Sequence, residues 1–379
     1  MRSYFILFFI SSLTGFSQDI SQETILLKRI SELQVQKDSF YHAGMFPTLR
    51  TNARNTNIVK HDNNIFFTAL VAFSLKQLRK NFTPAQQVIC DTIVQRAYRT
   101  YPYFKHHSGR PSYNFWPTDH PVIFPNNRLL NLFNQSQALP DDIDDTSMVW
   151  LSQDAPDSVV AIIHDLMIKH TNAARKQIRN TFKLYKNIPA YSTWFGNKMP
   201  IDFDFSALCN ALYFLYDRKV SFTKYDSATI NLLRLMIVHK QYKTDAAYIS
   251  PHYGRTSILL YHISRLLNRF SIVALDSLKP QLLQDAYTAL NKSDNMMDSV
   301  LLSTCIVRLG GSVTKCSYDN IHFVLAEQSR FVFFMASFAS MMPNPFKQLF
   351  LGNSRLKFYY SCAAYNLTLI LENLILQKK

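Results

Sequence analysis

Four aspartates crowd one short segment of the chain. Asp141, Asp142, Asp144 and Asp145 occupy four of five consecutive positions, directly after Pro140. Carboxylates held this close repel one another, so we expect the pKa of at least one of them to be raised. A neutral carboxylic acid beside an apolar cavity is the group needed to protonate a very weak base such as an alkene.

The spacing of these aspartates resembles a known motif. The run Asp142-x-Asp144-Asp145-Thr146-Ser147 is similar to the D-x-D-D-T-A motif of class II terpene cyclases, which belong to the α/α-toroid superfamily of terpenoid cyclases and prenyltransferases. The resemblance implies proton-initiated cyclisation of a linear, apolar isoprenoid, with Asp144 as the Brønsted acid and with Asp142 and Asp145 supporting it. It implies no required cofactor. The Q-x-x-x-G-x-W repeats of squalene–hopene cyclases are absent.

The same segment also spells a second motif. Asp141-Asp142-x-x-Asp145 matches D-D-x-x-D, the magnesium-binding motif of class I terpene synthases and chain-elongating prenyltransferases. That chemistry needs a second metal-binding segment of the N-D-x-x-S-x-x-x-E type, and the stretch at 295–299 lacks the final acid. Thr146 and a position at a helix start favour the class II interpretation. We therefore predict no metal ligands, with Mg²⁺ bound only if the substrate is a diphosphate.

A carbocation formed beside such an acid needs aromatic faces, because ring quadrupoles stabilise cations without attacking them. Two cations, Lys198 near an aromatic loop and Arg255 at a helix start, are candidates to bind a diphosphate. Asp204 is a second acid at a helix start. The other candidates for substrate binding are aromatic residues at expected inner-helix or loop positions: Trp150, Trp194, Phe203, Phe205, Tyr213, Tyr253 and Tyr261.

The elements that must position these residues are predicted to be helices. Six short apolar helices, expected to be buried, alternate with amphipathic ones, as in stacked helical hairpins. Closing six hairpins gives an α/α barrel over residues 18–379, and an open helical solenoid gives the same pattern. The apolar helices are expected at 64–78, 144–152, 204–216, 256–267, 298–309 and 358–371, and the amphipathic ones at 84–98, 156–185, 227–241, 279–290 and 319–338.

In a closed barrel, the starts of the inner helices gather at one mouth. Aspartates at 144, 204 and 298 suit the first helical turn, where they cap N–H groups and face the positive end of the helix dipole. Capping is the simpler interpretation of Asp298, which has no acidic neighbours at hand. Two aromatic-rich loops, 101–140 and 191–205, are expected to build the mouth.

Composition narrows the classes of protein. The chain has 379 residues, 47% of them apolar, which suits a large core and excludes disorder. Its eight glycines form no dinucleotide-binding, Walker or nucleophile-elbow signature. A net charge of +15 fits an anionic partner, but no nucleic-acid-binding motif accompanies it, so we predict no nucleic-acid partner. Basic residues at 176, 179, 183 and 186 are expected on one helix face.

The N-terminus resembles an export signal. A short basic start, an apolar run and a small-x-small site ending at Ser17 predict a signal peptide over residues 1–17. The location is then exported or periplasmic, and cytoplasmic if this prediction is wrong. The longest later apolar stretch, 331–342, suits a buried helix or a peripheral membrane contact. The apolar neighbours of Cys209, Cys305 and Cys362 predict packed thiols rather than bridges.

Two other functions are compatible with these features. One is an exported α/α-barrel glycosidase or polysaccharide lyase, with Asp144 and Asp204 as paired carboxylates and His252 or Tyr253 as an acid/base. The other is a non-catalytic helical scaffold whose aspartates only cap helices. Export favours the first of these, whereas the spelling of the motif favours the cyclase.

Overall fold

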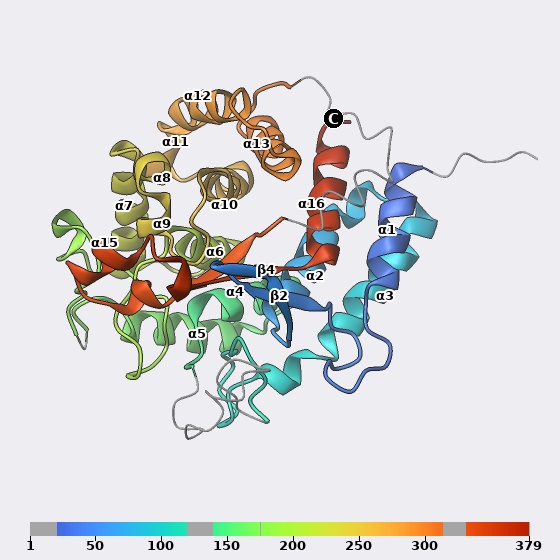
Figure 1. Cartoon of the computed structure of the whole chain (residues 1–379), viewed down its shortest axis with the longest axis horizontal. Coiled ribbons are helices and arrows are strands. Elements are labelled where there is room, and N and C mark those ends of the chain that lie inside the picture. Colours follow the sequence, from blue (N-terminus) through green and yellow to red (C-terminus); the bar gives the residue numbers. More distant parts are fainter. Residues whose placement is uncertain (1–20, 120–138, 175, 314–330, 379) are drawn as a thin grey trace, which may run out of the picture.

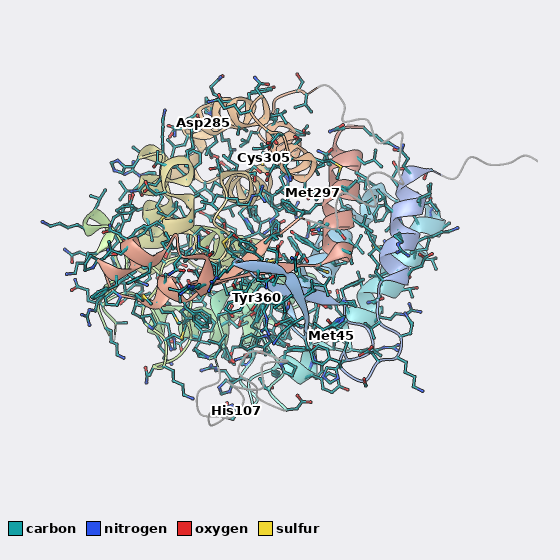
Figure 2. All side chains as sticks on the ribbon, viewed as in Figure 1. Met45, His107, Asp285, Met297, Cys305 and Tyr360 are labelled. Atoms are coloured by element: carbon teal, nitrogen blue, oxygen red, sulfur yellow. The ribbon has the colours of Figure 1, made fainter. Side chains whose placement is uncertain are left out.

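Helices dominate the computed structural model of the chain, which describes residues 21–119, 139–174, 176–313 and 331–378. The prediction of a mainly helical protein is confirmed (Figure 1). Side chains fill the space between the helices (Figure 2). Met297 and Cys305 are buried in this interior, whereas His107 lies exposed at the edge of the molecule.

Six apolar helices form a closed succession of contacts. Each packs against the next one along the chain, and the last packs against the first. Their side chains are buried on nearly all sides, because neighbouring helices cover both flanks of each. Figure 1 shows them around the middle of the molecule. They are α2 (Phe66–Leu78), α4 (Ile143–Ser152), α6 (Phe205–Asp217), α10 (Thr256–Arg269), α13 (Met296–Arg308) and α16 (Ala363–Leu376).

Amphipathic helices lie outside these six. In the sequence all of them except α1 come between the apolar helices, and α3, α7 and α12 pack against α2, α6 and α13. The start of α3 shows why a helix begins there, since Thr83 and Gln86 form a capping box around Pro84. The outer helices are α1 (Gln22–Glu32), α3 (Pro84–Tyr98), α5 (Asp157–Lys169), α7 (Lys224–Val238) and α12 (Lys279–Leu290), with short helices α8 (Gln241–Thr244), α9 (Ala246–Ile249), α11 (Val273–Asp276) and α15 (Phe346–Phe350).

The starts of the inner helices lie together. Side chains at the start of one helix bond to those of the next: the hydroxyl of Tyr253, just before α10, donates to Asp144 in α4. Arg255 pairs with Asp298 in the first turn of α13. Asp204, the N-cap of α6, accepts the backbone N–H of His252 at 3.0 Å. The starts of α4, α6, α10 and α13 therefore lie near one another.

A four-stranded antiparallel sheet lies beside these helix starts and corrects the all-α prediction. Its order is β2 (Asn55–Asp62), β1 (Thr48–Asn52), β4 (Lys357–Ser361), β3 (Phe334–Ser337). The edge strand β3 is tied to the helix starts, because the N–H of Met335 donates to the carbonyl of His252 at 2.8 Å.

Three predicted helices are wrong in part. Segment 331–342 is not a helix, because its alternating side chains pair as β3 with β4 before a short 3-10 turn. The helix predicted over 358–371 begins only at Ala363, because residues 357–361 are strand β4. The helix predicted over 156–185 ends at Lys169, and Ala173 has a φ of +68° that no α-helix contains. The basic residues after it therefore do not share a helix face.

Some predictions concern membranes, thiols and the N-terminus. No helix in the described ranges has the length and apolar character to cross a membrane. Cys90, Cys209, Cys305 and Cys362 are buried free thiols, so the prediction of packed thiols is confirmed. The signal at 1–17 and most of the helix predicted at 319–338 lie outside the described residues, so export stays a prediction.

Candidate functional site

The acidic motif forms the start of α4. Asp142 is the N-cap residue, and its Oδ1 accepts the backbone N–H groups of Asp144 at 2.9 Å and Asp145 at 2.7 Å. Aspartate suits this place because its carboxylate satisfies N–H groups that have no partner within the helix. Asp144 and Asp145 fall in the first helical turn and point in directions about 100° apart. All three carboxyl groups are buried.

Asp144 is held by two donors inside the ring of helices. Its Oδ1 accepts the amide of Asn210 at 2.6 Å, and its Oδ2 accepts the hydroxyl of Tyr253. Burial raises the pKa of Asp144 to about 7, against the lowering effect of these two hydrogen bonds, and the negative charges of Asp142 and Asp204 add to the rise. Asp144 is therefore poised to exchange a proton near neutral pH.

Asp145 occupies a different environment. Its Oδ1 is buried and has no hydrogen-bond partner among the described residues. Burial, followed by the neighbouring charges of Asp142, Asp144 and Asp141, raises the pKa of Asp145 well above its usual range. Asp142, its hydrogen-bonded neighbour, accepts two backbone N–H groups, which favour the charged form. The proton that this pair shares therefore resides on Asp145.

Asp141 turns away from the other three. Its carboxylate accepts from Ser112 and forms an ion pair with Arg110 at 2.9 Å. Asp141 is not among the residues that line the cavity next to the motif. The D-D-x-x-D interpretation needs Asp141 and Asp145 to bind the same magnesium ions. Because the side chain of Asp141 points away from the cavity that Asp145 lines, the structure does not support this interpretation. Among the described residues, no three His, Cys, Asp or Glu side chains are grouped as metal ligands.

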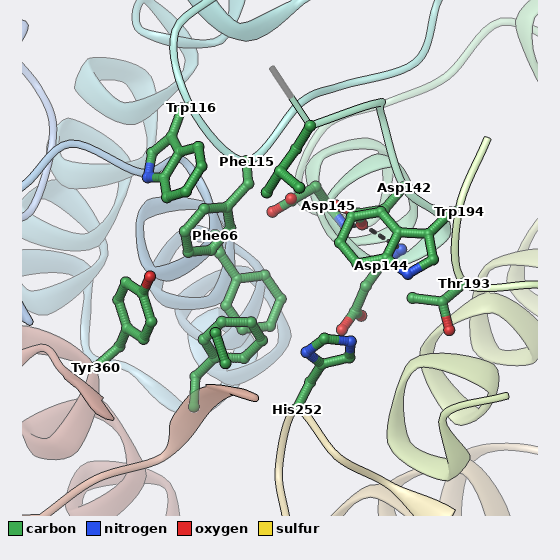
Figure 3. A pocket seen from close by; sticks show the side chains of 13 residues that line it. Phe66, Phe115, Trp116, Asp142, Asp144, Asp145, Thr193, Trp194, His252 and Tyr360 are labelled. Carbon is green, nitrogen blue, oxygen red and sulfur yellow. Dashed lines mark hydrogen bonds between the residues drawn. The ribbon is translucent and has the colours of Figure 1, made fainter. Parts of the chain in front are cut away.

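The three remaining aspartates line a mostly apolar cavity (Figure 3). The volume of the cavity is about 60 Å³, which is room for only a few waters. In Figure 3 the Asp145 carboxyl points toward Phe115, whereas Asp144 points toward the side of His252. The lining residues are Phe66, Phe115, Trp116, Leu139, Asp142, Asp144, Asp145, Thr193, Trp194, His252, Phe334, Ala336 and Tyr360.

His252 faces this cavity from the loop before α10. Its ring is buried, and neither ring nitrogen has a hydrogen-bond partner within the described ranges. The carboxylate of Asp202 lies 3.9 Å from Nε2. The ring of Phe334 stacks on the imidazole at a centroid distance of 5.9 Å, and Trp194 meets it edge-on at 5.8 Å. The imidazole is thus a polar group on an otherwise aromatic wall.

Two further hollows lie near the cavity. One shares Leu139, Trp194, His252 and Ala336 with it and continues between apolar side chains such as Phe358. The other lies beside Arg110, Lys169 and His170 and is wider, at about 340 Å³. The cavity that the aspartates line is not the widest of the three.

The structure separates the predicted site residues into three groups. Asp142, Asp144, Asp145 and Trp194 line the cavity, and Tyr253 lies behind Asp144. Asp204 caps α6 and is not among the lining residues, and Arg255 is paired with Asp298. The other predicted residues lie elsewhere. Phe203, Phe205 and Tyr213 are buried in the core, and Lys198 is exposed on its loop. Trp150 packs against Tyr113, and Tyr261 lies beside Glu372.

Sequence reasoning did not select several lining residues. Phe334 and Tyr360 come from strands that were predicted as helices. The alternation along β3, with Met335 and Ser337 buried and Phe334 and Ala336 on the cavity side, is the signal that could have found Phe334. Phe115 and Trp116 lie in the aromatic loop that was expected at the mouth, but no single residue of it stood out. In the sequence, Phe66 has the pattern of an ordinary core residue of α2.

Replacing Tyr253 with phenylalanine is expected to raise the pKa of Asp144 further. The hydroxyl of Tyr253 stabilises the charged carboxylate, and its loss favours the protonated form. Because a hydrogen bond to a charged group contributes about 1.5–3 kcal/mol, the variant should also be measurably less stable. Carbon-13 NMR titration of the aspartates checks the shift. Tyr365→Phe, which removes another buried hydroxyl, should leave Asp144 unchanged, and equal shifts would contradict the assignment.

Comparison with known proteins adds no family to this picture. No family model, curated protein or solved structure matches the chain. The likeness to class II terpene cyclases therefore depends on the motif at Asp142, Asp144 and Asp145 and on the geometry around it. The chemical feature in common is a set of buried carboxyl groups at one helix start that face an aromatic cavity.

Proposed function

We propose that the chain is a class II terpene cyclase-like enzyme with an α/α-toroid fold. Its reaction would be the proton-initiated cyclisation of a linear isoprenoid. The single observation that carries the proposal is a buried aspartate with a raised pKa at the start of α4, beside an aromatic cavity. The closed succession of contacts among α2, α4, α6, α10, α13 and α16 supports the fold.

The chemistry needs a suitable acid and a cavity without free water. An acid must hold a proton at neutral pH and deliver it to an alkene, which is an extremely weak base. Burial supplies the first condition, because desolvation penalises the charged form of both Asp144 and Asp145. The cavity must also exclude water, which would otherwise trap the cation. Thirteen side chains, mostly apolar, line it, and its volume admits few waters.

Aromatic side chains would stabilise the cation as it moves along the chain. Phe66, Phe115, Phe334 and Trp194 lie around the aspartates, and Phe334 stacks on Phe115 with centroids 5.4 Å apart. Each ring face attracts a cation by up to about 2 kcal/mol in a desolvated site. A folded isoprenoid would need more room than the cavity itself offers. The adjoining hollow toward Phe358 would supply it with apolar surface.

His252 would end the reaction. A cyclised cation becomes a neutral alkene when it loses a proton from a neighbouring carbon. The imidazole is the group placed for this, since both ring nitrogens lack partners among the described residues and the ring faces the cavity. The proton gained from the acid and the proton lost to the base balance, so the overall reaction is an isomerisation.

The glycosidase alternative receives less support. It needs a second carboxylate across the cavity from Asp144, and Asp204 was the candidate. Asp204 instead accepts N–H groups at the start of α6, the hydroxyl of Ser250 and the N–H of His252. A sugar also brings many hydroxyl groups, for which the walls offer few partners. Capping alone does not account for Asp145, whose carboxyl bonds to no helix N–H in the described structure.

Incubating the purified chain with linear isoprenoids tests the proposed function. Squalene and geranylgeranyl diphosphate, analysed by gas chromatography–mass spectrometry after phosphatase treatment, should give cyclic isomers of unchanged mass. The double variant Asp144→Asn/Asp145→Asn should give none. Asp157→Asn provides the matched control, because it removes an exposed first-turn aspartate from α5. Absence of any cyclic product with both substrates, alongside cleavage of an oligosaccharide panel, would overturn the proposal.

A further inference from the structure

We propose that one face of the molecule binds the surface of an anionic lipid bilayer. The segment 341–357, which contains α15, and the segment 174–187 form this face, and we call it the docking face. Figure 1 shows α15 at the edge of the molecule. The inference goes beyond the proposed function, because none of the residues that carry it lines the cavity beside the aspartates.

Helix α15 exposes three large apolar side chains on one side. Phe346, Leu349 and Phe350 are 52%, 71% and 40% exposed. They are three and four positions apart, so they project from the same side of a helical turn. Lys347 is buried instead, and its ammonium donates to the carbonyl of Asn180 at 2.9 Å. The buried lysine thus anchors the helix while a cluster of apolar side chains faces solvent, which is typical of an interaction surface.

The segment 174–187 lies directly beside α15 and supplies positive charge. The backbone N–H of Asn344, just before α15, donates to the carbonyl of Arg179 at 2.8 Å, and its side-chain amide donates to the carbonyl of Thr181 at 2.8 Å. Neither 174–187 nor 341–357 contains an aspartate or a glutamate. The exposed basic residues of the two segments are Lys176, Arg179, Lys183, Lys186 and Arg355.

The combination of exposed apolar side chains and positive charge selects the partner. Anionic headgroups attract Lys and Arg, and the acyl chains next to them accept apolar side chains. A nucleic acid would match the charge but would leave Phe346, Leu349 and Phe350 in water. A second copy of the chain would match the apolar side chains but would bring the same positive charge to the contact. An anionic bilayer is complementary to both features at once.

Cosedimentation with lipid vesicles tests the docking face. The purified full chain should bind vesicles of equal parts phosphatidylcholine and phosphatidylglycerol roughly tenfold more tightly than vesicles of phosphatidylcholine alone, because the basic residues add attraction only to a charged surface. Raising the salt concentration from about 0.1 M to about 1 M should remove this preference, since the Debye length falls from about 10 Å to about 3 Å. Equal binding to both kinds of vesicle at low salt, or no binding to either, would overturn the inference.

One double variant tests the apolar part of the docking face. Leu349→Ser/Phe350→Ser should weaken binding to the anionic vesicles by roughly 10–100-fold, because it removes side chains that enter the acyl layer. The matched control Val88→Ser/Val273→Ser removes exposed apolar side chains from α3 and α11 and should leave binding unchanged. All four positions are exposed, so circular dichroism should show the same folded chain in each case.

A second double variant tests the charge. Lys183→Gln/Lys186→Gln should weaken binding to the anionic vesicles by roughly tenfold and leave binding to phosphatidylcholine unchanged. The control Lys28→Gln/Lys80→Gln replaces exposed lysines outside the docking face and should change neither.

Two results would assign the docking face differently. Vesicle binding that survives Leu349→Ser/Phe350→Ser would place the membrane contact in another part of the chain and overturn the inference. A dimer in size-exclusion chromatography that this variant dissociates, without vesicle binding by the unchanged chain, would assign the face to a second copy and would also overturn it.

Discussion

Replacing Arg308 with methionine is expected to lower the free energy of unfolding by about 3–5 kcal/mol, because the change leaves a charge buried without its partner. Arg308 ends α13 and pairs with Glu372 of α16 in the interior of the molecule. Its guanidinium also lies over the ring of Tyr261 of α10, 4.5 Å from the centroid, and Tyr261 donates to Glu372 at 2.7 Å. These three side chains connect three consecutive inner helices.

Urea denaturation measures this effect, and a second substitution tests its cause. Arg308→Met combined with Glu372→Leu removes both charges and replaces them with apolar groups, so it should recover most of the lost stability. The exposed pair Arg29–Glu32 on α1 provides the contrast, since Arg29→Met should cost about 0–1 kcal/mol. A double variant as unstable as Arg308→Met would show that packing, rather than the unpaired charge, causes the loss.

Replacing Trp194 with alanine is expected to lower the rate of cyclisation by roughly 30-fold, which corresponds to about 2 kcal/mol of cation–π stabilisation in a desolvated site. Trp194 lines the cavity and meets the ring of His252 edge-on. Its backbone is also fixed, because Trp194 forms a β-bridge with Asp142 at the start of α4. Trp194→Phe keeps a ring face and should retain most of the activity. The measurement is kcat with the best isoprenoid found.

Trp150 offers a matched control on the same helix as the aspartates. Its indole packs against Tyr113, donates to the carbonyl of Pro111 at 2.7 Å and does not line the cavity. Trp150→Ala should therefore reduce stability without a specific loss in kcat of the folded fraction. If Trp150→Ala and Trp194→Ala slowed the reaction equally, the losses would reflect general destabilisation and the cation–π role of Trp194 would be excluded.

The inner helices were largely predictable from the sequence. Predicted starts at 64, 144, 204, 256 and 298 differ by at most two residues from those of α2, α4, α6, α10 and α13. Two local signals explain this success. A capping residue such as Asp204 marks where free N–H groups begin, and a run that is apolar on every side marks a helix covered by neighbours. Both signals depend on residues that are close together in the chain, so they can be recognised from a short stretch of sequence.

The sheet was not predictable in this way. Strand β4 pairs with β1, which lies about 300 residues earlier in the chain, and with β3. The backbone partners of Lys357–Ser361 are thus set by contacts that no local window contains. Segment 331–342 illustrates the ambiguity, because a short apolar run fits a buried helix and a buried strand equally well. Pairing of residues 334–337 with β4 decided in favour of the strand.

The sequence by itself determined that a dense acidic motif begins a buried helix and that one carboxyl pKa there must rise, because repulsion and capping depend on residues at most three positions apart. Only the tertiary structure decided which groups surround each acid. Asn210 and Tyr253, from other helices and loops, bind both oxygens of Asp144. Phe115 and Phe334 approach Asp145 from a loop and a strand that are distant along the chain. The direction of a side chain and the desolvation it meets depend on these neighbours, which only the folded chain brings together.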